Sequence, residues 1–200
     1  LCQEVTEIRK SYAKDLTAQT TAALQDLNFL DVNFAIDFRK KKNYTDNGTD
    51  DIQYLISTNP GETLKPLGQI VSGGELSRIM LALKAILADR DEIETLIFDE
   101  IDTGISGRTA QKVSEKMAVI GQHHQVLCIT HLPQIAAMAD HHFYIEKNAT
   151  DHSTATTITE LSEADSLKEL ARLSGAAQLT ESVLANAKEM KDLAEKKKQN

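Results

Sequence analysis

The fold is decided by residues 71–106, VSGGELSRIMLALKAILADRDEIETLIFDEIDTGIS. The stretch Ser72-Gly73-Gly74-Glu75 has the pattern of a helix start, because Ser72 is a good N-cap residue and Glu75 follows it by three positions. We expect a helix from Gly74 to about Ala88. Its apolar residues form a broad stripe that should pack against a core: Leu76, Ile79, Met80, Leu83, Ile86 and Leu87.

A helix start of this composition is suited to an anion such as phosphate. The first turn of a helix presents unpaired N–H groups and about half a positive charge. Glycine lets the backbone approach a ligand closely, and the hydroxyl of Ser72 adds a donor. Taken alone, however, the pattern is more typical of an ordinary capped helix after a glycine turn.

Two apolar runs end in residues that suit nucleotide chemistry. Leu96-Ile97-Phe98 predicts a short buried strand, and Asp99 and Glu100 follow it at the edge where ligands bind in open α/β sheets. Asp99 could bind Mg²⁺ and Glu100 could polarise a water molecule. A second run, residues 126–130, ends before His131, which could contact a terminal phosphate. Each feature alone also fits a solvated strand end.

The flanking segments predict further elements. Residues 1–28 have the spacing of one amphipathic helix, either a single surface helix or the end of a coiled coil. Residues 29–58 alternate as a hairpin would, and the basic run Arg39-Lys40-Lys41-Lys42 falls at its expected tip. Four adjacent cations suit a DNA backbone, although such runs are commonly solvated strand ends. Residues 142–147 and 154–160 predict a strand pair, and 109–120, 167–173 and 179–197 predict helices.

Composition limits the class of protein. The 200 residues carry a formal net charge of −8, so the chain as a whole is not a basic nucleic-acid binder. Its longest apolar runs are shorter than the roughly 20 residues that span a bilayer, so we expect no membrane partner. Cys128 lies inside an apolar run and predicts a reduced, buried thiol of a cytosolic protein.

The order of the three motifs resembles a known class of ATPase. SGGE opening a helix, then LIFDE, then ITHL at 129–132, is the layout of the C-terminal half of an ATP-binding-cassette ATPase. Transporter cassettes commonly have Gln and Pro where this chain has Glu75 and Ile101. SGGELSR, FDEIDTGISG and ITHLPQIA together resemble the RecN family of SMC-like bacterial DNA-repair ATPases.

This resemblance implies an α/β fold, the C-terminal half of a P-loop ATPase head with a mixed sheet flanked by helices. Residues 1–28 would be the foot of a returning coiled-coil arm, and residues 29–200 the C-terminal part of the head. Asp99 would serve a Mg²⁺ site, directly or through water. Glu100 would be the general base, or would position the attacking water, and His131 would be the switch histidine.

The resemblance also implies contacts across a dimer. Ser72, Gly73, Gly74 and Glu75 would contact the γ-phosphate of ATP bound to the opposite protomer, and Arg78 would help to anchor that surface. Residues 102–107, beginning with Asp102, would be the D-loop at the seam. Ser106 takes the place of the usual D-loop aspartate. This composite site requires an exposed Gly73-Gly74 turn, with Asp99, Glu100 and His131 facing one side of the molecule.

One required part of such a site is absent from the sequence. None of the nine glycines is followed by Lys-Ser or Lys-Thr, so there is no phosphate-binding Walker A loop. The resemblance therefore implies an ATPase head completed by an upstream segment, and a chain that is inactive alone. It further implies a homodimer of heads, DNA as partner and a cytoplasmic, nucleoid-associated protein. A transporter ATP-binding subunit and a non-catalytic dimerisation module are the alternatives.

Overall fold

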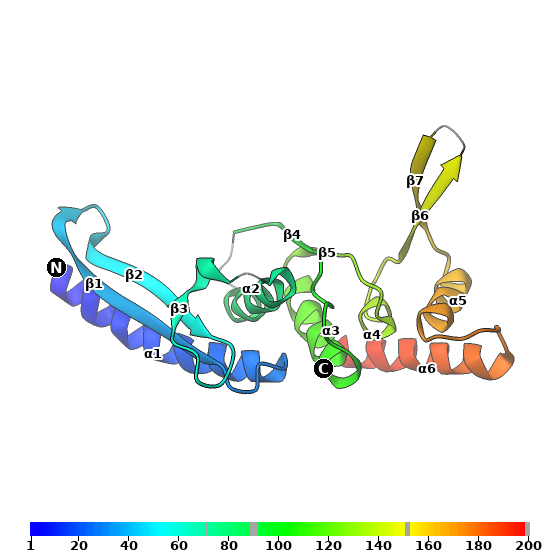
Figure 1. Cartoon of the computed structure of the whole chain (residues 1–200), viewed down its shortest axis with the longest axis horizontal. Coiled ribbons are helices and arrows are strands. Elements are labelled where there is room, and N and C mark those ends of the chain that lie inside the picture. The colour runs from blue at the N-terminus through cyan, green and yellow to red at the C-terminus, as the bar shows by residue number, and fades with distance from the viewer. Residues whose placement is uncertain (71, 89–91, 151–152, 199–200) are drawn as a thin grey trace.

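The computed structural model describes residues 1–70, 72–88, 92–150 and 153–198 (Figure 1). Val71, the first residue of the deciding stretch, lies outside these ranges. The molecule is elongated, with a long helix at each end and the predicted nucleotide motifs between them. Among the described residues, no helix combines the length and apolar character needed to cross a bilayer.

The N-terminal part is a helix packed along a hairpin. Helix α1 (Cys2–Asp26) lies beside strands β1 (Asn33–Thr45) and β2 (Gly48–Ser57), and β3 (Lys65–Pro66) pairs with β2. Arg9 joins helix to hairpin, because its guanidinium donates to the Asp50 carboxylate at 2.8 Å. The side chains of Ile8 and Tyr12 on α1 remain exposed.

The hairpin differs from the sequence prediction at its tip. The sequence placed Arg39–Lys42 there, but β1 continues to Thr45 and the turn is made by the two residues before Gly48. The turn residues are Asp46 and Asn47, and Gly48 follows them with φ +87°, a left-handed value that glycine adopts without steric cost. The basic run therefore lies along the exposed part of β1, where Lys40 pairs in register with Asp50 of β2.

The central part contains the predicted motifs. A short 3-10 turn (Leu67–Gln69) precedes α2 (Gly73–Leu87), which is followed by β4 (Thr95–Phe98), α3 (Gly107–Gly121), β5 (Gln125–Cys128) and α4 (Pro133–Ala136). Strands β4 and β5 pair in parallel, with Phe98 opposite Cys128. Both strands therefore end at the same edge, which is where Asp99 and Ile129 begin the following loops.

The apolar stripe predicted on α2 is only partly buried. Ile79 is fully buried, but Leu76, Met80 and Leu87 are each more than one third exposed. The buried positions also include Arg78, a charged residue inside the core face. Periodicity identified the helix correctly, and Ile79, Leu83 and Ile86 of the stripe do pack on the core, so the prediction of the buried side is correct for half of its residues.

The C-terminal part is a separate hairpin with two helices. Strands β6 (Phe143–Thr150) and β7 (Ser153–Glu160) pair antiparallel, as predicted, but form a two-stranded sheet of their own. Helices α5 (Glu163–Leu173) and α6 (Glu181–Lys198) follow. The mixed α/β class is thus confirmed, with the described strands divided among three small sheets.

Two apolar clusters stabilise this arrangement. The larger cluster joins α1, the base of the first hairpin, α2, β4 and α3, and the smaller joins α4, α5 and α6. The fully buried aliphatic side chains of the larger cluster are Leu24, Leu27, Ile79, Leu81, Ile101, Val113 and Ile120. This cluster fixes both α2 and the loop after β4, and so sets the geometry of the candidate site.

Candidate nucleotide site

The helix start at Ser72 is formed as predicted. Ser72 is the N-cap of α2, and its hydroxyl accepts the N–H of Glu75 at 3.4 Å. Ser72 and Gly73 are exposed, as a surface that acts on a second protomer requires. Gly74 is buried, so the expectation of an exposed Gly73-Gly74 turn is correct for Gly73 and wrong for Gly74.

Both glycines lie against the loop that follows β4. A Cβ built on Gly73 would come within 2.7 Å of Oε2 of Glu100, and one on Gly74 within 2.9 Å of the Glu100 carbonyl oxygen. The two motifs that the sequence separates by 25 positions are therefore in contact in one chain. The carboxylate of Glu100 already lies beside the exposed start of α2, which is the environment that a helix N-terminus offers to an anion.

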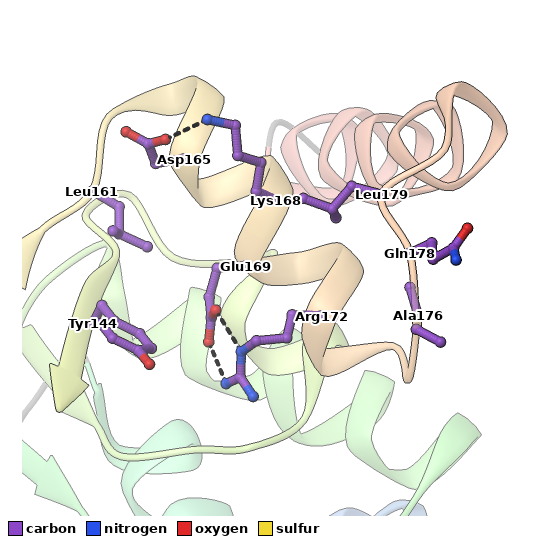
Figure 2. A pocket seen from close by; sticks show the side chains of 10 residues that line it. Tyr144, Leu161, Asp165, Lys168, Glu169, Arg172, Ala176, Gln178 and Leu179 are labelled. Carbon is purple, nitrogen blue, oxygen red and sulfur yellow. Dashed lines mark hydrogen bonds and ion pairs between the residues drawn. The ribbon is translucent and has the colours of Figure 1, made fainter. Parts of the chain in front are cut away.

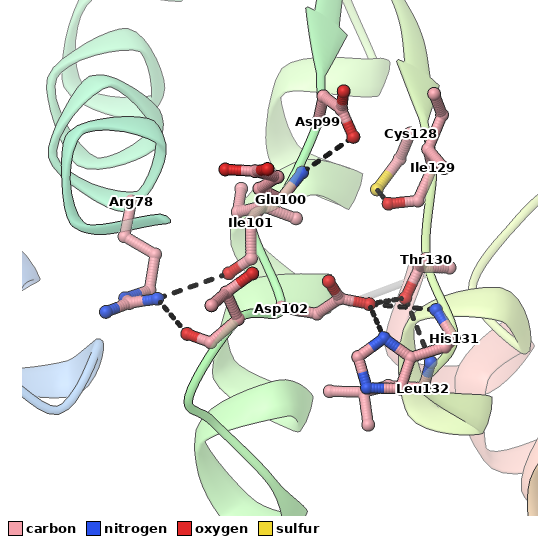
Figure 3. A network of polar contacts seen from close by, with 11 residues as sticks. Arg78, Asp99, Glu100, Ile101, Asp102, Cys128, Ile129, Thr130, His131 and Leu132 are labelled. Atoms are coloured by element: carbon pink, nitrogen blue, oxygen red, sulfur yellow. Dashed lines mark hydrogen bonds and ion pairs between the residues drawn. The ribbon is translucent and has the colours of Figure 1, made fainter. Parts of the chain in front are cut away.

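Glu100 has an unusual backbone conformation. Its φ is +56°, a left-handed value that is uncommon for residues other than glycine. Such conformations cost roughly 1–3 kcal/mol and tend to cluster at functional sites. The side chain of Glu100 is exposed and leaves the end of β4 towards α2 (Figure 3).

Asp99 is the first residue after β4 and is exposed. Its Oδ1 accepts the N–H of Glu100 at 2.9 Å, and its backbone carbonyl accepts the hydroxyl of Ser77 at 3.0 Å. One carboxylate with a free side suits Mg²⁺, which is usually bound through one or two carboxylates, substrate phosphates and water. The described residues contain no cluster of three or more acidic, histidine or cysteine side chains that would bind a metal alone.

Arg78 fastens the helix to the loop. Its guanidinium donates to the carbonyl oxygen of Thr103 at 2.9 Å and to that of Ile101 at 3.5 Å (Figure 3). The guanidinium also lies over the ring of Phe29. Burial lowers the pKa of Arg78 from its ordinary value. The anchoring role suggested by its position, one turn after SGGE, agrees with these contacts.

His131 is exposed and follows β5, as predicted, but its partner is Asp102. The ring Nδ1 lies 2.9 Å from Oδ2 of Asp102, whereas Asp99 and Glu100 occupy the other side of the loop (Figure 3). Asp102 is buried, with 5% of its surface exposed, so in this chain it faces inward to the loop of His131. Thr130 joins the same contact, and nothing in the sequence pattern singled it out.

Cys128 is the last residue of β5 and lies opposite Phe98 of β4. Burial raises the pKa of its thiol to about 12, with further contributions from the carboxylates of Asp102 and Asp99. The thiol is therefore protonated at neutral pH and acts as a small apolar side chain. Cys128 has no disulfide partner, but it is only partly buried and not fully buried as the sequence predicted.

A hollow of about 390 Å³ lies elsewhere, between β6, α5 and the segment before α6 (Figure 2). Its charged side chains pair with each other, Arg172 with Glu169 and Lys168 with Asp165. None of the predicted nucleotide residues lines it. The candidate site is therefore the open edge at β4 and β5.

The comparisons with known proteins agree with this geometry. No family model matches the chain. It is 44% identical over 194 residues to the DNA repair protein RecN of Halalkalibacterium halodurans, a match that covers 95% of the chain and 34% of that protein. The chain is RecN-like. It is also 40% identical to RecN of Bacillus subtilis, over 93% of the chain and 35% of that protein.

The likeness to RecN is thus continuous along almost the whole chain, which spans about a third of the length of these relatives. Among solved structures, the fold is similar to the Smc head domain with a coiled coil and joint from Pyrococcus yayanosii. That match has a TM-score of 0.56 at 18% identity and covers 84% of the chain and 30% of that protein. A Smc head domain from Pyrococcus furiosus gives a TM-score of 0.52. The fold of the RecN-like chain is that of part of an SMC head.

Proposed function

We propose that this chain is the C-terminal part of an ATPase head of the RecN type, acting in DNA double-strand-break repair and recombination. The observation that carries the proposal is the contact between the exposed start of α2 and the loop after β4, beside His131 at the end of β5. The proposed signature motif touches the loop of the acidic pair, and the proposed switch histidine follows the neighbouring parallel strand and contacts Asp102 in that same loop. The likeness to RecN and to SMC heads supports the same assignment.

Each residue then has a role in hydrolysis. Asp99 serves the Mg²⁺ site, Glu100 activates or positions the attacking water, and His131 contacts the γ-phosphate. Ser72 and Gly73, both exposed, contact the γ-phosphate of ATP held by the opposite head, and Gly74 and Glu75 shape the turn behind them. In this chain the carboxylate of Glu100 lies beside Gly73. It must therefore turn away before the γ-phosphate held by the opposite head can reach that glycine.

The phosphate clamp is supplied by another part of the protein. The face of the β4–β5 pair supports this, because Ile97, Leu127 and Ile129 are each about half exposed or more. Parallel sheets are normally covered on both faces, so the open apolar face of these two strands fits a sheet whose covering layer comes from another segment. The chain alone is then a poor ATPase or none.

Dimerisation couples ATP to movement. Two heads enclose two ATP molecules, and each site joins the phosphate clamp and acidic pair of one head to Ser72-Gly73 of the other. ATP favours the closed pair because it binds that state better than the open one. Hydrolysis removes the γ-phosphate contacts and reopens the heads.

DNA contacts are proposed for the exposed basic run on β1. Arg39 is paired with Asp37 at 2.8 Å, so Lys41 and Lys42, whose side chains are exposed, are the better candidates for phosphate contacts. The exposed Ile8 and Tyr12 of α1 fit a helix that continues in a coiled-coil arm. A protein with these contacts works at the nucleoid in the cytoplasm.

Ser72→Arg tests the role of α2 in the dimer. In a protein that also carries the phosphate-binding loop, the variant should bind ATP normally but fail to dimerise with ATP, as measured by light scattering. Ser162→Arg is the matched control, because Ser162 also caps a helix and accepts the N–H of Asp165. ATP-dependent dimers of the Ser72 variant would remove the proposed contact across the heads.

Measured ATP turnover separates a RecN-type ATPase from a non-catalytic dimerisation module. A non-catalytic dimerisation module would bind ATP and associate, yet its slow background hydrolysis would not depend on Glu100. The left-handed backbone at Glu100 favours the catalytic candidate, since strain of this kind collects at working sites.

A further inference from the structure

Asp102 occupies a position that the proposed hydrolytic site does not yet explain. It follows Glu100 by two residues, and only 6% of its side chain is exposed. Because β4 and β5 are parallel neighbours, the loop that contains Asp102 meets the loop that contains Thr130 and His131. A carboxylate buried at such a junction is costly unless donors surround it.

Two donors and one ring nitrogen converge on one oxygen of this carboxylate. Oδ2 of Asp102 accepts the hydroxyl of Thr130 at 2.6 Å and the backbone N–H of His131 at 2.8 Å, and it lies 2.9 Å from the ring Nδ1 of His131 (Figure 3). Thr130 in turn accepts the N–H of Leu132 at 3.0 Å. The backbone and the ring of His131 are thus fixed by the same atom.

This geometry determines where the proton sits on the imidazole. A carboxylate oxygen accepts hydrogen bonds, and Nδ1 of His131 lies 2.9 Å from one, so a proton on Nδ1 is the arrangement that fits this contact. The other ring nitrogen, Nε2, is then the atom left for a ligand, and 72% of the His131 side chain is exposed. The same relation orients metal-binding histidines through a carboxylate behind the ring.

We infer that Asp102 is a positioning residue that sets the tautomer and direction of His131, so that Nε2 faces the γ-phosphate. Its effect on turnover rests on the proposed function, whereas the tautomer is a property of the chain without nucleotide. Thr130 supports Asp102 by occupying the remaining acceptor capacity of Oδ2. Asp102 thereby acts through His131 instead of touching the nucleotide.

The test is the tautomer of His131, measured by long-range proton–nitrogen NMR on protein with nitrogen-15-labelled histidine. His131→Gln assigns the signals, and spectra are recorded without nucleotide at about pH 8, where an ordinary imidazole is neutral. The wild-type protein should show the Nδ1–H form. A wild-type spectrum with the Nε2–H form would overturn the inference, whether or not any variant folds.

Variants separate positioning from simple structural support. Asp102→Ala should move His131 to the Nε2–H form that free neutral imidazoles favour, while the exposed Asp46→Ala leaves it unchanged. Asp102→Asn keeps an acceptor oxygen and should retain the Nδ1–H form. If folded Asp102→Ala keeps the Nδ1–H form, Asp102 does not set it.

Turnover gives an independent readout in a protein that carries the phosphate-binding loop. Asp102→Ala should lower ATP hydrolysis in the otherwise unmutated protein. In a protein that already carries His131→Gln, adding Asp102→Ala should cause no further loss. A further loss in the double variant would show that Asp102 acts separately from His131. No hydrolysis in the unmutated protein would refute the proposed function and leave the tautomer result standing.

Discussion

The contact between α2 and the loop after β4 predicts opposite behaviour for two adjacent glycines. A Cβ on Gly73 meets only the end of the Glu100 side chain, which is exposed and flexible. A Cβ on Gly74 would lie 2.9 Å from the Glu100 carbonyl oxygen and 3.1 Å from Cβ of Thr103. That loop cannot yield easily, because Arg78 bonds the carbonyl of Thr103.

The magnitudes follow from these neighbours. Overpacking against fixed atoms destabilises the folded state by about 1–3 kcal/mol. Replacing a helical glycine by alanine stabilises it by up to about 1 kcal/mol through helix propensity. Gly74→Ala should therefore lower the free energy of unfolding by about 1–2 kcal/mol. For a domain of this size each kcal/mol shifts Tm by about 2–4 °C, so Tm should fall by about 2–8 °C. Gly73→Ala should be neutral or slightly stabilising.

Thermal and urea unfolding followed by circular dichroism measure both variants. Gly68→Ala is the control, because nothing lies within 4 Å of a Cβ at that position. Equal stabilities of the Gly73 and Gly74 variants would show that α2 does not rest on the loop of Glu100 in this way. The proposed contact between α2 and the loop after β4 would then be wrong.

Three further predictions concern single side chains. Cys128, whose thiol pKa is raised to about 12, should resist alkylation at pH 8 in the native protein and react after unfolding. Fast labelling of the native protein should therefore occur only at Cys2. A Cys2→Ser protein that is still labelled fast in its native state would contradict this. Burial lowers the pKa of His142, so the unfolded chain binds the extra proton and stability should fall as pH drops below about 6.5; His142→Gln should flatten that slope in urea titrations. Arg78→Met should lower the free energy of unfolding by about 1–3 kcal/mol, since it leaves the buried carbonyl of Ile101 and the part-buried carbonyl of Thr103 without their donor, and an unchanged urea midpoint would refute that role.

Local patterns predicted the elements of the site well. Ser72 with Glu75 marked the start of α2, and the two apolar runs before Asp99 and His131 became β4 and β5. These signals act within a few residues, through capping and through the burial of short strands. The helix and strands that hold the candidate residues could therefore be predicted from the sequence.

Contacts between distant loops could not be predicted in this way. The carboxylate of Asp102 was expected at a dimer seam, and its inward bonds to Thr130 and His131 arise only when two parallel strands bring their ends together. Likewise, the basic run was expected at the hairpin tip, because its alternation is lost where both faces of β1 are solvated. The exposed apolar positions on α2 show that a stripe indicates a partner surface without identifying the partner.

The central claim is that this chain supplies the water-activating and dimer-facing parts of an ATP site whose phosphate clamp lies elsewhere in the protein. Its most direct test is ATP hydrolysis by the chain alone, by the chain mixed with the segment that carries the phosphate-binding loop, and by the same mixture with Glu100→Gln. We predict negligible turnover alone, turnover on mixing, and loss of turnover with retained ATP-dependent association in the variant. Equal turnover by the chain alone, or an unaffected Glu100→Gln mixture, would contradict the claim.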